Sequence, residues 1–143
     1  MNSPHISTAV EEQNIDVIHR FLANESAWAR GIPIQVVRDS LKNSLNFGLF
    51  LADNQVAYAR VVSDYSTFAY LVDVFVLQEH RGKGYSRMLM AAIVSHPRLQ
   101  GLRRFMLATS TAHGLYEKYG FTAPAKPHTL MERFVPNAYQ PDA

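Results

Sequence analysis

The chain has 143 residues, 48% of them hydrophobic, and a formal net charge of +2 at neutral pH. This length and composition predict a single globular domain over residues 1–143, and the weak positive charge argues against the dense basic surface of a nucleic-acid binder. The sequence contains no cysteine, which excludes disulfides, thiolate metal sites and a cysteine nucleophile.

The chain carries no signal for export or membrane insertion. Its first residues, MNSPHISTAVEEQN, have neither a basic start nor an apolar core, and no apolar run approaches the length of a membrane span. We therefore expect a soluble cytoplasmic protein that binds neither membranes nor nucleic acid.

The N-terminal part of the chain is typical of a short strand followed by two helices. Residues 5–10 are a candidate edge strand. Asn14 is the expected cap of a helix over residues 15–24, where apolar residues recur at helical spacing. Residues 25–33 mix Gly and Pro and predict an ordered loop, and Pro33 fits the first turn of a second helix.

The pattern changes to strands from residue 47. Residues 47–52 and 56–63 flank the turn signal Asp53-Asn54, so we expect them to pair as an antiparallel hairpin. Residues 68–77 continue as the third strand of a meander.

The most informative stretch of the sequence is residues 71–89, LVDVFVLQEHRGKGYSRML. An apolar run interrupted only by Asp73 predicts a buried strand, Gly82 and Gly84 predict a tight turn, and helical spacing of apolar residues begins at Tyr85. A helix that begins directly after a glycine turn presents free N–H groups and the positive end of its dipole. Such a turn is suited to holding a phosphate or diphosphate.

After this helix the sequence predicts one more buried strand over residues 103–109. A strand, a crossover helix and a second strand imply a parallel pair. We expect an α/β (α+β) fold with a mixed central sheet: an antiparallel N-terminal meander and one parallel pair. We expect a final helix over residues 112–119 that ends at Gly120. We also expect a last strand over residues 130–135 and a tail over residues 136–143.

Two segments of this sequence resemble those of the GNAT N-acetyltransferase superfamily. Residues 81–86, RGKGYS, resemble its acyl-CoA loop R-x-x-G-x-G/A, and residues 112–121, AHGLYEKYGF, resemble its later A-x-x-L-Y-x-x-x-G-F segment. A glycine motif alone is weak, whereas both segments in this order, separated by one helix and one strand, are specific. The resemblance extends over residues 45–134 and implies a single GNAT-like domain.

The resemblance implies that acetyl-CoA is the co-substrate. Loop amides would hold its pyrophosphate, the end of the preceding strand would line the thioester, and the N–H near Val76 would polarise the acetyl carbonyl. Ser86 departs from the family's Gly or Ala, and Thr109 stands where many relatives have asparagine. The implied cofactor-binding residues are Phe75, Val76, Leu77, Arg81, Gly82, Lys83, Gly84, Tyr85, Ser86 and Thr109.

By the same resemblance Tyr116 would protonate the departing thiolate, with a role as a core aromatic residue as the alternative. Asp73 would receive the proton of the amine or anchor an ammonium group, while Val72 replaces a carboxylate of some polyamine-acetylating relatives. The alternative for Asp73 is an ion pair with an arginine such as Arg60 on a neighbouring strand. The six histidines show no paired ligand spacing, so no metal is expected.

The leading hypothesis is an N-acetyltransferase that transfers acetyl directly to a primary amine in one ternary complex. One alternative is a non-catalytic acyl-CoA-binding module on the same fold. A second is a nucleotide-binding protein, but the sequence lacks the G-x-x-x-x-G-K-[ST] run that such sites use. Asp64 and Asp73 favour a small cationic acceptor, and Trp28 is a candidate to close its pocket. The resemblance also allows a homodimer.

Overall fold

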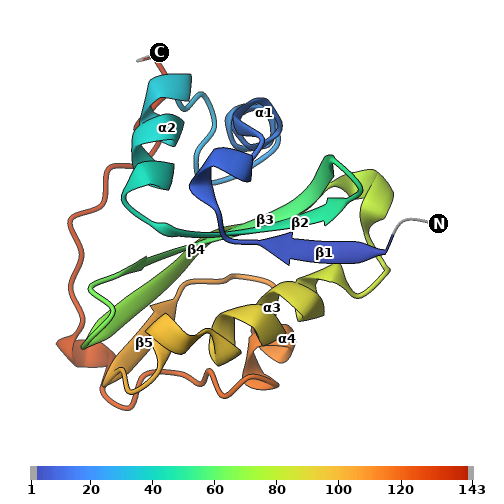
Figure 1. Ribbon diagram of the computed structural model, residues 1–143. Helices are drawn as coiled ribbons and strands as arrows, with labels where there is room; N and C mark the ends of the chain where they lie inside the picture. Colours follow the sequence, from blue (N-terminus) through green and yellow to red (C-terminus); the bar gives the residue numbers. More distant parts are fainter. Residues whose placement is uncertain (1–2, 142–143) are drawn as a thin grey trace.

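Two helices cover one face of the central sheet (Figure 1). In the computed structural model, which describes residues 3–141, α1 spans Ile15–Asn24 and α2 spans Ile34–Lys42. The Oδ1 atom of Asn14 accepts a hydrogen bond from the Val17 N–H at 3.1 Å, so Asn14 caps α1 as its sequence predicts. Pro33 precedes α2 as its cap residue.

The sheet has five strands in the order β1-β2-β3-β4-β5. Neighbouring strands are antiparallel from β1 to β4, and β4 and β5 are parallel. The strands are β1 Pro4–Ser7, β2 Leu45–Leu51, β3 Asn54–Ser63, β4 Phe68–Val76 and β5 Arg104–Leu107. This mixed sheet confirms the predicted fold class.

The opposite face of the sheet is covered by α3, Tyr85–Ser95, and by the short α4, His113–Glu117 (Figure 1). Helix α3 is the crossover between the parallel strands β4 and β5. Short 3₁₀ helices complete the structure: η1 Val10–Glu12, η2 Gln78–His80, η3 Pro97–Leu99 and η4 Pro127–Thr129.

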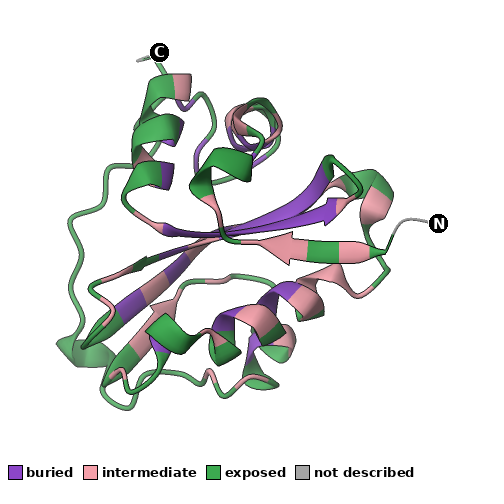
Figure 2. Ribbon diagram, viewed as in Figure 1, coloured by how far each residue is buried: buried purple, intermediate pink, exposed green. Residues whose placement is uncertain are grey.

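Each face of the sheet packs its own hydrophobic core, and β2 and β3 are buried between them (Figure 2). On the α1 and α2 face, Ile18, Leu22 and Val37 pack with Tyr58 and Phe75. On the α3 face the core is made by Phe47, Leu49, Leu89, Met90 and Ile93 together with further strand residues. The apolar faces of the helices, predicted from their spacing, are thus the faces that cover the sheet.

A β-bulge at Asp73 reverses the alternation of β4. Val72 lies opposite Arg60 and Phe75 opposite Tyr58, so Asp73 and Val74 together face the single residue between them on β3. Asp73 has a left-handed φ of 57°, a conformation that is uncommon outside glycine. As a result Leu71 belongs to the core on the α3 face, whereas Phe75 belongs to the core on the α1 and α2 face.

Beyond this bulge β4 and β5 separate. Their parallel pairing runs from Phe68 opposite Arg104 to Leu71 opposite Leu107. Strand β4 then continues to Val76, while β5 ends at Leu107. The last part of β4 therefore has a backbone edge that β5 does not cover, and this edge leads to the glycine turn before α3.

Apart from the predicted last strand, the predicted elements are present with shifted ends. The edge strand ends at Ser7, and Val10 begins a 3₁₀ helix. The hairpin turn is formed by Ala52 and Asp53, with Asn54 already in β3. The final helix is shorter than predicted.

The prediction of a last strand over residues 130–135 is wrong. These residues form neither helix nor strand and are exposed, because the segment leads away from β5 and pairs with no strand among residues 3–141. The predicted tail is irregular up to residue 141, and its last two residues lie outside the described part.

Candidate functional site

Two glycines in the left-handed conformation build the turn between β4 and α3. Gly82 has a φ of 79° and Gly84 a φ of 83°, which is costly for residues with a side chain. Gly84 is the cap residue of α3, and no side chain caps this helix. The first N–H groups of α3 are therefore available at the positive end of its dipole.

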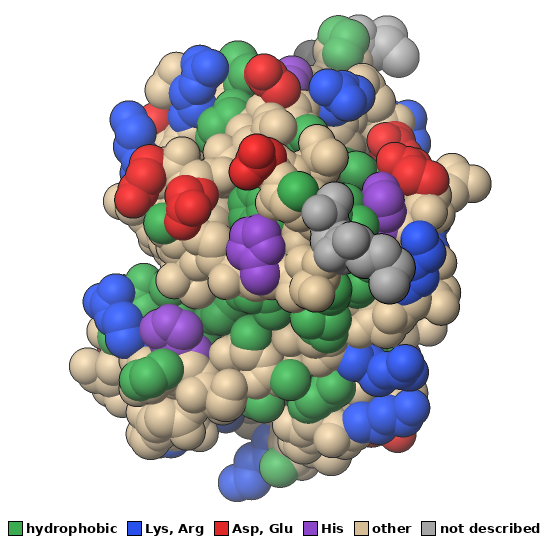
Figure 3. Space-filling view, turned by 45° about the vertical axis from the view of Figure 1, so that its right-hand side comes forward, with side chains coloured by type: hydrophobic (Ala, Val, Ile, Leu, Met, Phe, Trp, Pro, Cys, Tyr) green, Lys and Arg blue, Asp and Glu red, His purple; other side chains and the backbone are tan. Residues whose placement is uncertain are grey.

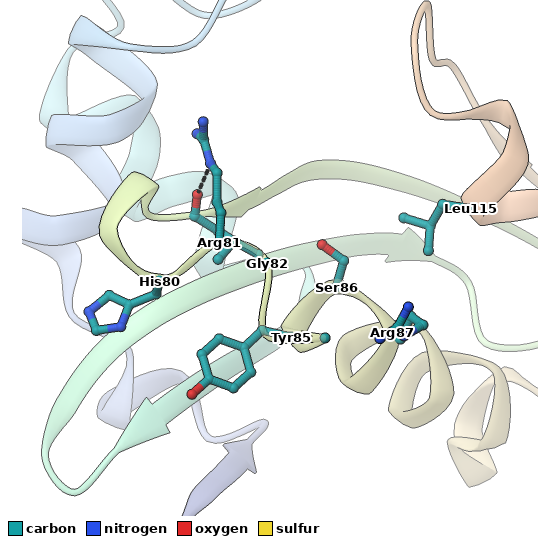
Figure 4. Close-up of a pocket in the computed structure, with 9 residues that line it drawn as sticks. His80, Arg81, Gly82, Tyr85, Ser86, Arg87 and Leu115 are labelled. Atoms are coloured by element: carbon teal, nitrogen blue, oxygen red, sulfur yellow. Dashed lines mark hydrogen bonds between the residues drawn. The ribbon is translucent and has the colours of Figure 1, made fainter.

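A cavity of about 290 Å³ lies at this turn (Figure 4). Its lining residues are Val76, His80, Arg81, Gly82, Gly84, Tyr85, Ser86, Arg87 and Leu115. The cavity thus brings together most of the residues expected to bind the cofactor. Lys83 is exposed and does not line it.

Arg81 ties the turn to the end of β4. Its Nε donates a hydrogen bond to the Val76 carbonyl at 2.9 Å, drawn as a dashed line in Figure 4. In the same view the Ser86 side chain lies between Arg81 and Leu115. Arg81 therefore holds the turn against the strand, and with Arg87 it places positive charge at the cavity.

The N–H of Val76 faces the gap between β4 and β5. The Leu77 N–H donates to the Val56 carbonyl on β3 at 2.9 Å, and Val76 lies opposite Ala57. Successive backbone groups of an antiparallel strand alternate in direction, so the N–H of Val76 points away from β3. Phe75 and Leu77 direct their N–H groups to β3 instead, and Phe75 stacks on Phe21 with ring centroids 4.0 Å apart.

Tyr116 and Thr109 line a second, larger groove of about 880 Å³ along β5. Tyr116 is 9% exposed, and its burial raises the pKa of its hydroxyl above the ordinary value. The hydroxyl therefore keeps its proton at physiological pH. Thr109 Oγ1 accepts a hydrogen bond from the Ala112 N–H at 3.1 Å, which orders the start of α4.

Asp73 is held between two donors on different elements. Its Oδ2 accepts from Arg60 Nε at 3.0 Å, and its Oδ1 accepts from Trp28 Nε1 at 2.7 Å. The carboxylate is buried, while Trp28 remains 53% exposed. The ion pair with Arg60, weighed above as the alternative for Asp73, is confirmed. Its role in proton transfer stays a prediction.

Asp64 is occupied within its own turn. Its carboxylate accepts hydrogen bonds from the Thr67 hydroxyl and from the N–H groups of Thr67, Ser66 and Phe68. These bonds, led by that of the Thr67 hydroxyl, hold the pKa of Asp64 well below its usual range. The carboxylate therefore stays ionised and orders the turn between β3 and β4.

Two features of the site carry no signal in the sequence. His80 lines the cavity, and its Nδ1 is buried without a hydrogen-bond partner among the described residues. Trp28, the sequence candidate for the acceptor pocket, donates a hydrogen bond to Asp73, which lies 45 positions away in the chain. Only the packing of the loop after α1 against the β4 bulge brings them together.

The acidic side chains are unevenly distributed on one face of the molecule. On the face shown in Figure 3, most acidic side chains lie in the upper part, hydrophobic side chains form a band across the middle, and Lys and Arg are spread around the edges. Within residues 3–141, no group of three His, Asp or Glu side chains is placed to hold a metal ion. No helix in this part of the chain is long and apolar enough to cross a bilayer.

Comparison with known proteins gives a consistent result. Residues 46–123 match the model of the acetyltransferase (GNAT) domain. A protein of the fungus Gibberella zeae, named as an acetyltransferase, is 30% identical over an alignment of 135 residues; the match covers 79% of this chain and 75% of the relative.

Solved structures share the fold. A crystal structure of a protein from Xanthomonas campestris pv. campestris, described as belonging to the GNAT family, is 56% identical with a TM-score of 0.96 and covers 99% of both chains. An acetyltransferase structure with acetyl-CoA from Clostridium acetobutylicum is 15% identical with a TM-score of 0.63, and covers 94% of this chain and 96% of that one. The second match concerns the fold alone.

Proposed function

The chain belongs to the GNAT acetyltransferase family, and from this premise we propose that it transfers acetyl from acetyl-CoA directly to the primary amine of a small cationic acceptor. The observation that carries the proposal is the separation of β4 and β5 beyond Leu71 and Leu107. It leaves the Val76 N–H facing a gap directly beside the glycine turn. A thioester in this gap and a diphosphate at the turn would be held by consecutive parts of the chain.

The residues at the turn fit a diphosphate. The free N–H groups at the start of α3, the two left-handed glycines and the guanidinium of Arg87 supply donors and positive charge at one cavity. Ser86 adds a hydroxyl in the first turn of the helix. A small side chain at this position leaves room for the close approach that the family's Gly or Ala allows.

The Val76 N–H is the donor that we assign to the developing oxyanion. Because the Val76 carbonyl is already bound by Arg81, the strand end is held in place before the substrate arrives. A preorganised donor of this kind contributes about 10²–10³ to a rate. Acetyl-CoA supplies the activated acyl group, and the chain orients it.

Tyr116 is the residue that we assign as general acid. In direct transfer a C–N bond forms and the C–S bond breaks, so the sulfur needs a proton. Tyr116 retains its proton at neutral pH because burial raises its pKa, and it lies in α4 next to Leu115, which lines the diphosphate cavity. We assign Thr109 a positioning role, because its hydroxyl accepts a hydrogen bond from the Ala112 N–H and orders the start of α4.

Asp73 and Trp28 are the residues that we assign to the acceptor. Each oxygen of Asp73 already accepts one hydrogen bond and retains a second lone pair. The carboxylate is thus oriented to anchor an ammonium group and to take its proton, directly or through water. The exposed face of the Trp28 indole offers a cation–π contact next to it.

A thiol-release assay with acetyl-CoA against a library of amines tests the proposal. We expect turnover with small diamines and other cationic amines, and none with acidic or neutral acceptors. Acetyl-CoA binding by calorimetry without thiol release on any amine would instead indicate a non-catalytic acyl-CoA-binding module. No binding of acetyl-CoA would contradict both functions.

A further inference from the structure

Arg60 lies at the margin of the helical cover on the α1 and α2 face of the sheet. Side chains of a strand alternate between the two faces, so Tyr58, Arg60 and Val62 of β3 share this face. Tyr58 is fully buried in the core under the helices, the Arg60 side chain is 16% exposed, and Val62 is 41% exposed. One side of Arg60 is thus packed, and the other side is open to solvent.

The guanidinium of Arg60 is held in one orientation by two partners. Its Nε donates a hydrogen bond to Asp73 Oδ2, and its Nη1 donates one to Ser44 Oγ, both at 3.0 Å. The Ser44 hydroxyl donates in turn to the Ser40 carbonyl in α2 at 2.7 Å. The guanidinium is therefore tied both to the bulge of β4 and to the end of α2, and its position is set before any ligand binds.

The Nη2 atom of Arg60 remains available to a ligand. An arginine side chain has five N–H donors, and Nη2, which carries two of them, has no hydrogen-bond partner within residues 3–141. The only buried side-chain nitrogen or oxygen without a partner in these residues is His80 Nδ1, so Nη2 is reached by solvent. The structure thus presents a fixed cationic donor directly beside the carboxylate that we assign to the acceptor.

We propose that the acceptor is an α-amino acid with a basic side chain, whose carboxylate binds Arg60 Nη2 and whose α-amine, held by Asp73, receives the acetyl group. This inference rests on the proposed function and narrows its acceptor class. The ammonium and carboxylate groups of such a molecule are separated by a single carbon, which suits the ion pair of Arg60 and Asp73, whose atoms lie 3.0 Å apart. The exposed indole face of Trp28 remains for the side-chain cation.

Amines without a carboxylate complement the site less well. They offer no anion for Arg60 Nη2 to bind, so this donor keeps only its contact with water. A second ammonium group placed near the guanidinium is also repelled by its like charge. The carboxylate of an amino acid removes both disadvantages, because it pairs with Arg60 and lowers the net positive charge of the acceptor.

Arg60 acts on the affinity for the acceptor and not on the chemical step. The α-ammonium nitrogen loses two protons as its C–N bond to the acetyl group forms and the C–S bond breaks; one proton ends on the sulfur and the other in solvent. Neither proton passes through the guanidinium, because an arginine is not deprotonated in proteins. A change at Arg60 that keeps its charge should therefore appear in KM rather than in kcat.

L-Arginine and agmatine form the matched pair of acceptors that tests the inference. Each carries one amine that can be acetylated and the same guanidinium side chain, and they differ only in the carboxylate. In a thiol-release assay with acetyl-CoA we expect the KM for L-arginine to be at least about tenfold below that for agmatine, the order expected for a hydrogen bond between charged groups. L-Argininamide, which keeps the shape and lacks the anion, should behave like agmatine.

Arg60→Lys is the variant that isolates the guanidinium. It keeps a positive charge beside Asp73 and removes Nη2, so the KM ratio of the two acceptors should fall towards one. Both acceptors are measured on the same preparation, and a loss of folded protein cancels in the ratio. Arg98→Lys is the matched control: Arg98 is exposed, lies 3.6 Å from the centre of the Tyr65 ring, and should leave the ratio unchanged.

Calorimetry gives a readout that needs no turnover. L-Arginine is titrated into protein saturated with CoA, which carries no acetyl group to transfer. We expect binding to the natural protein and an affinity at least about tenfold lower in Arg60→Lys. Equal affinities in the two proteins, or no binding of L-arginine to the natural protein, would overturn the inference.

The outcomes separate failure of the inference from failure of the proposed function. Thiol release with agmatine and no advantage for L-arginine would overturn the inference and leave the proposed function intact. An advantage for L-arginine that persists in Arg60→Lys would also overturn it, because another group would then bind the carboxylate. Absence of thiol release with every amine would contradict the proposed function, and the calorimetric titration would then decide alone whether Arg60 binds a carboxylate.

Discussion

Trp28 and Asp73 are joined by a hydrogen bond of 2.7 Å from the indole Nε1 to the Oδ1 of the carboxylate. The bond links the loop after α1 to the bulge at which β4 leaves β5. Because Arg60 holds the second oxygen, the carboxylate cannot turn without breaking a charge-assisted bond. The loop that we assign to the acceptor and the strand that we assign to the thioester are therefore positioned together.

Trp28→Phe keeps an aromatic ring and removes the donor to Asp73. The buried Oδ1 atom would lose its partner, so we expect the free energy of unfolding to fall by about 1–3 kcal/mol. The KM for the acceptor should rise, while the affinity for acetyl-CoA should not change. Urea unfolding, acceptor kinetics and calorimetry measure these quantities. Equal losses for acceptor and acetyl-CoA would contradict a role confined to the acceptor side.

A comparison of Asp73→Asn with Arg60→Met separates the effect of losing the ion pair from the effect of losing the carboxylate. Both substitutions break the pair, and we expect each to lower stability by roughly 1–3 kcal/mol. Only Asp73→Asn removes the anionic group that would meet the amine. Turnover should therefore fall more in Asp73→Asn than in Arg60→Met at matched fractions of folded protein. Equal turnover in the two variants would leave Asp73 as a structural residue.

Tyr116→Phe removes the proposed proton donor and keeps the ring that packs against Phe121. We expect kcat to fall by about 10²–10⁴, with little change in the melting temperature. Tyr119→Phe is the control, since it removes the hydroxyl that donates to the Arg87 carbonyl at 3.1 Å. The control should lose far less activity; a comparable loss in both variants would point to disturbed packing of α4.

The pH dependence of kcat follows from the direction in which the pKa of Tyr116 is shifted. An acid acts only while it holds its proton, and burial raises the pKa of Tyr116 above its ordinary value of about 10. Activity controlled by this group should therefore persist as pH rises through 10 and fall only at higher pH. A pH–rate profile measured within the range of the protein's stability checks this. A fall centred below pH 10 that is absent from Tyr116→Phe would show that the pKa is lowered instead.

Gly84→Ala and Gly101→Ala compare the same backbone strain at two places. The φ angles are 83° and 73°, so each alanine should cost about 1–2 kcal/mol of stability. A Cβ at Gly84 would also lie 3.1 Å from an Nη of Arg87, whereas nothing lies within 4 Å at Gly101. We expect Gly84→Ala alone to weaken acetyl-CoA binding, by about tenfold or more, equal to about 1.4 kcal/mol. Titration calorimetry measures the acetyl-CoA affinity of both variants. Equal affinities would contradict the assignment of this turn to the diphosphate.

The sequence alone determined the features that depend on local chemistry. Asn14 is a helix cap, and Gly82 and Gly84 can form a left-handed turn wherever they occur in a chain. The apolar spacing after Tyr85 defines a helix face without reference to the rest of the fold. Strand, turn and helix around residues 71–95 were therefore predictable, and with the second segment at residues 112–121 they led to the family.

Only the tertiary structure decided the features that depend on distant partners. The bulge at Asp73, the direction of the Val76 N–H and the bond to Trp28 result from the register between β3 and β4 and from the docking of the loop after α1, which periodicity does not encode. The same reason accounts for residues 130–135. Their composition predicts a strand, but a strand exists only where another backbone supplies its hydrogen bonds, and within the single chain the structure leads this segment away from the open edge of β5.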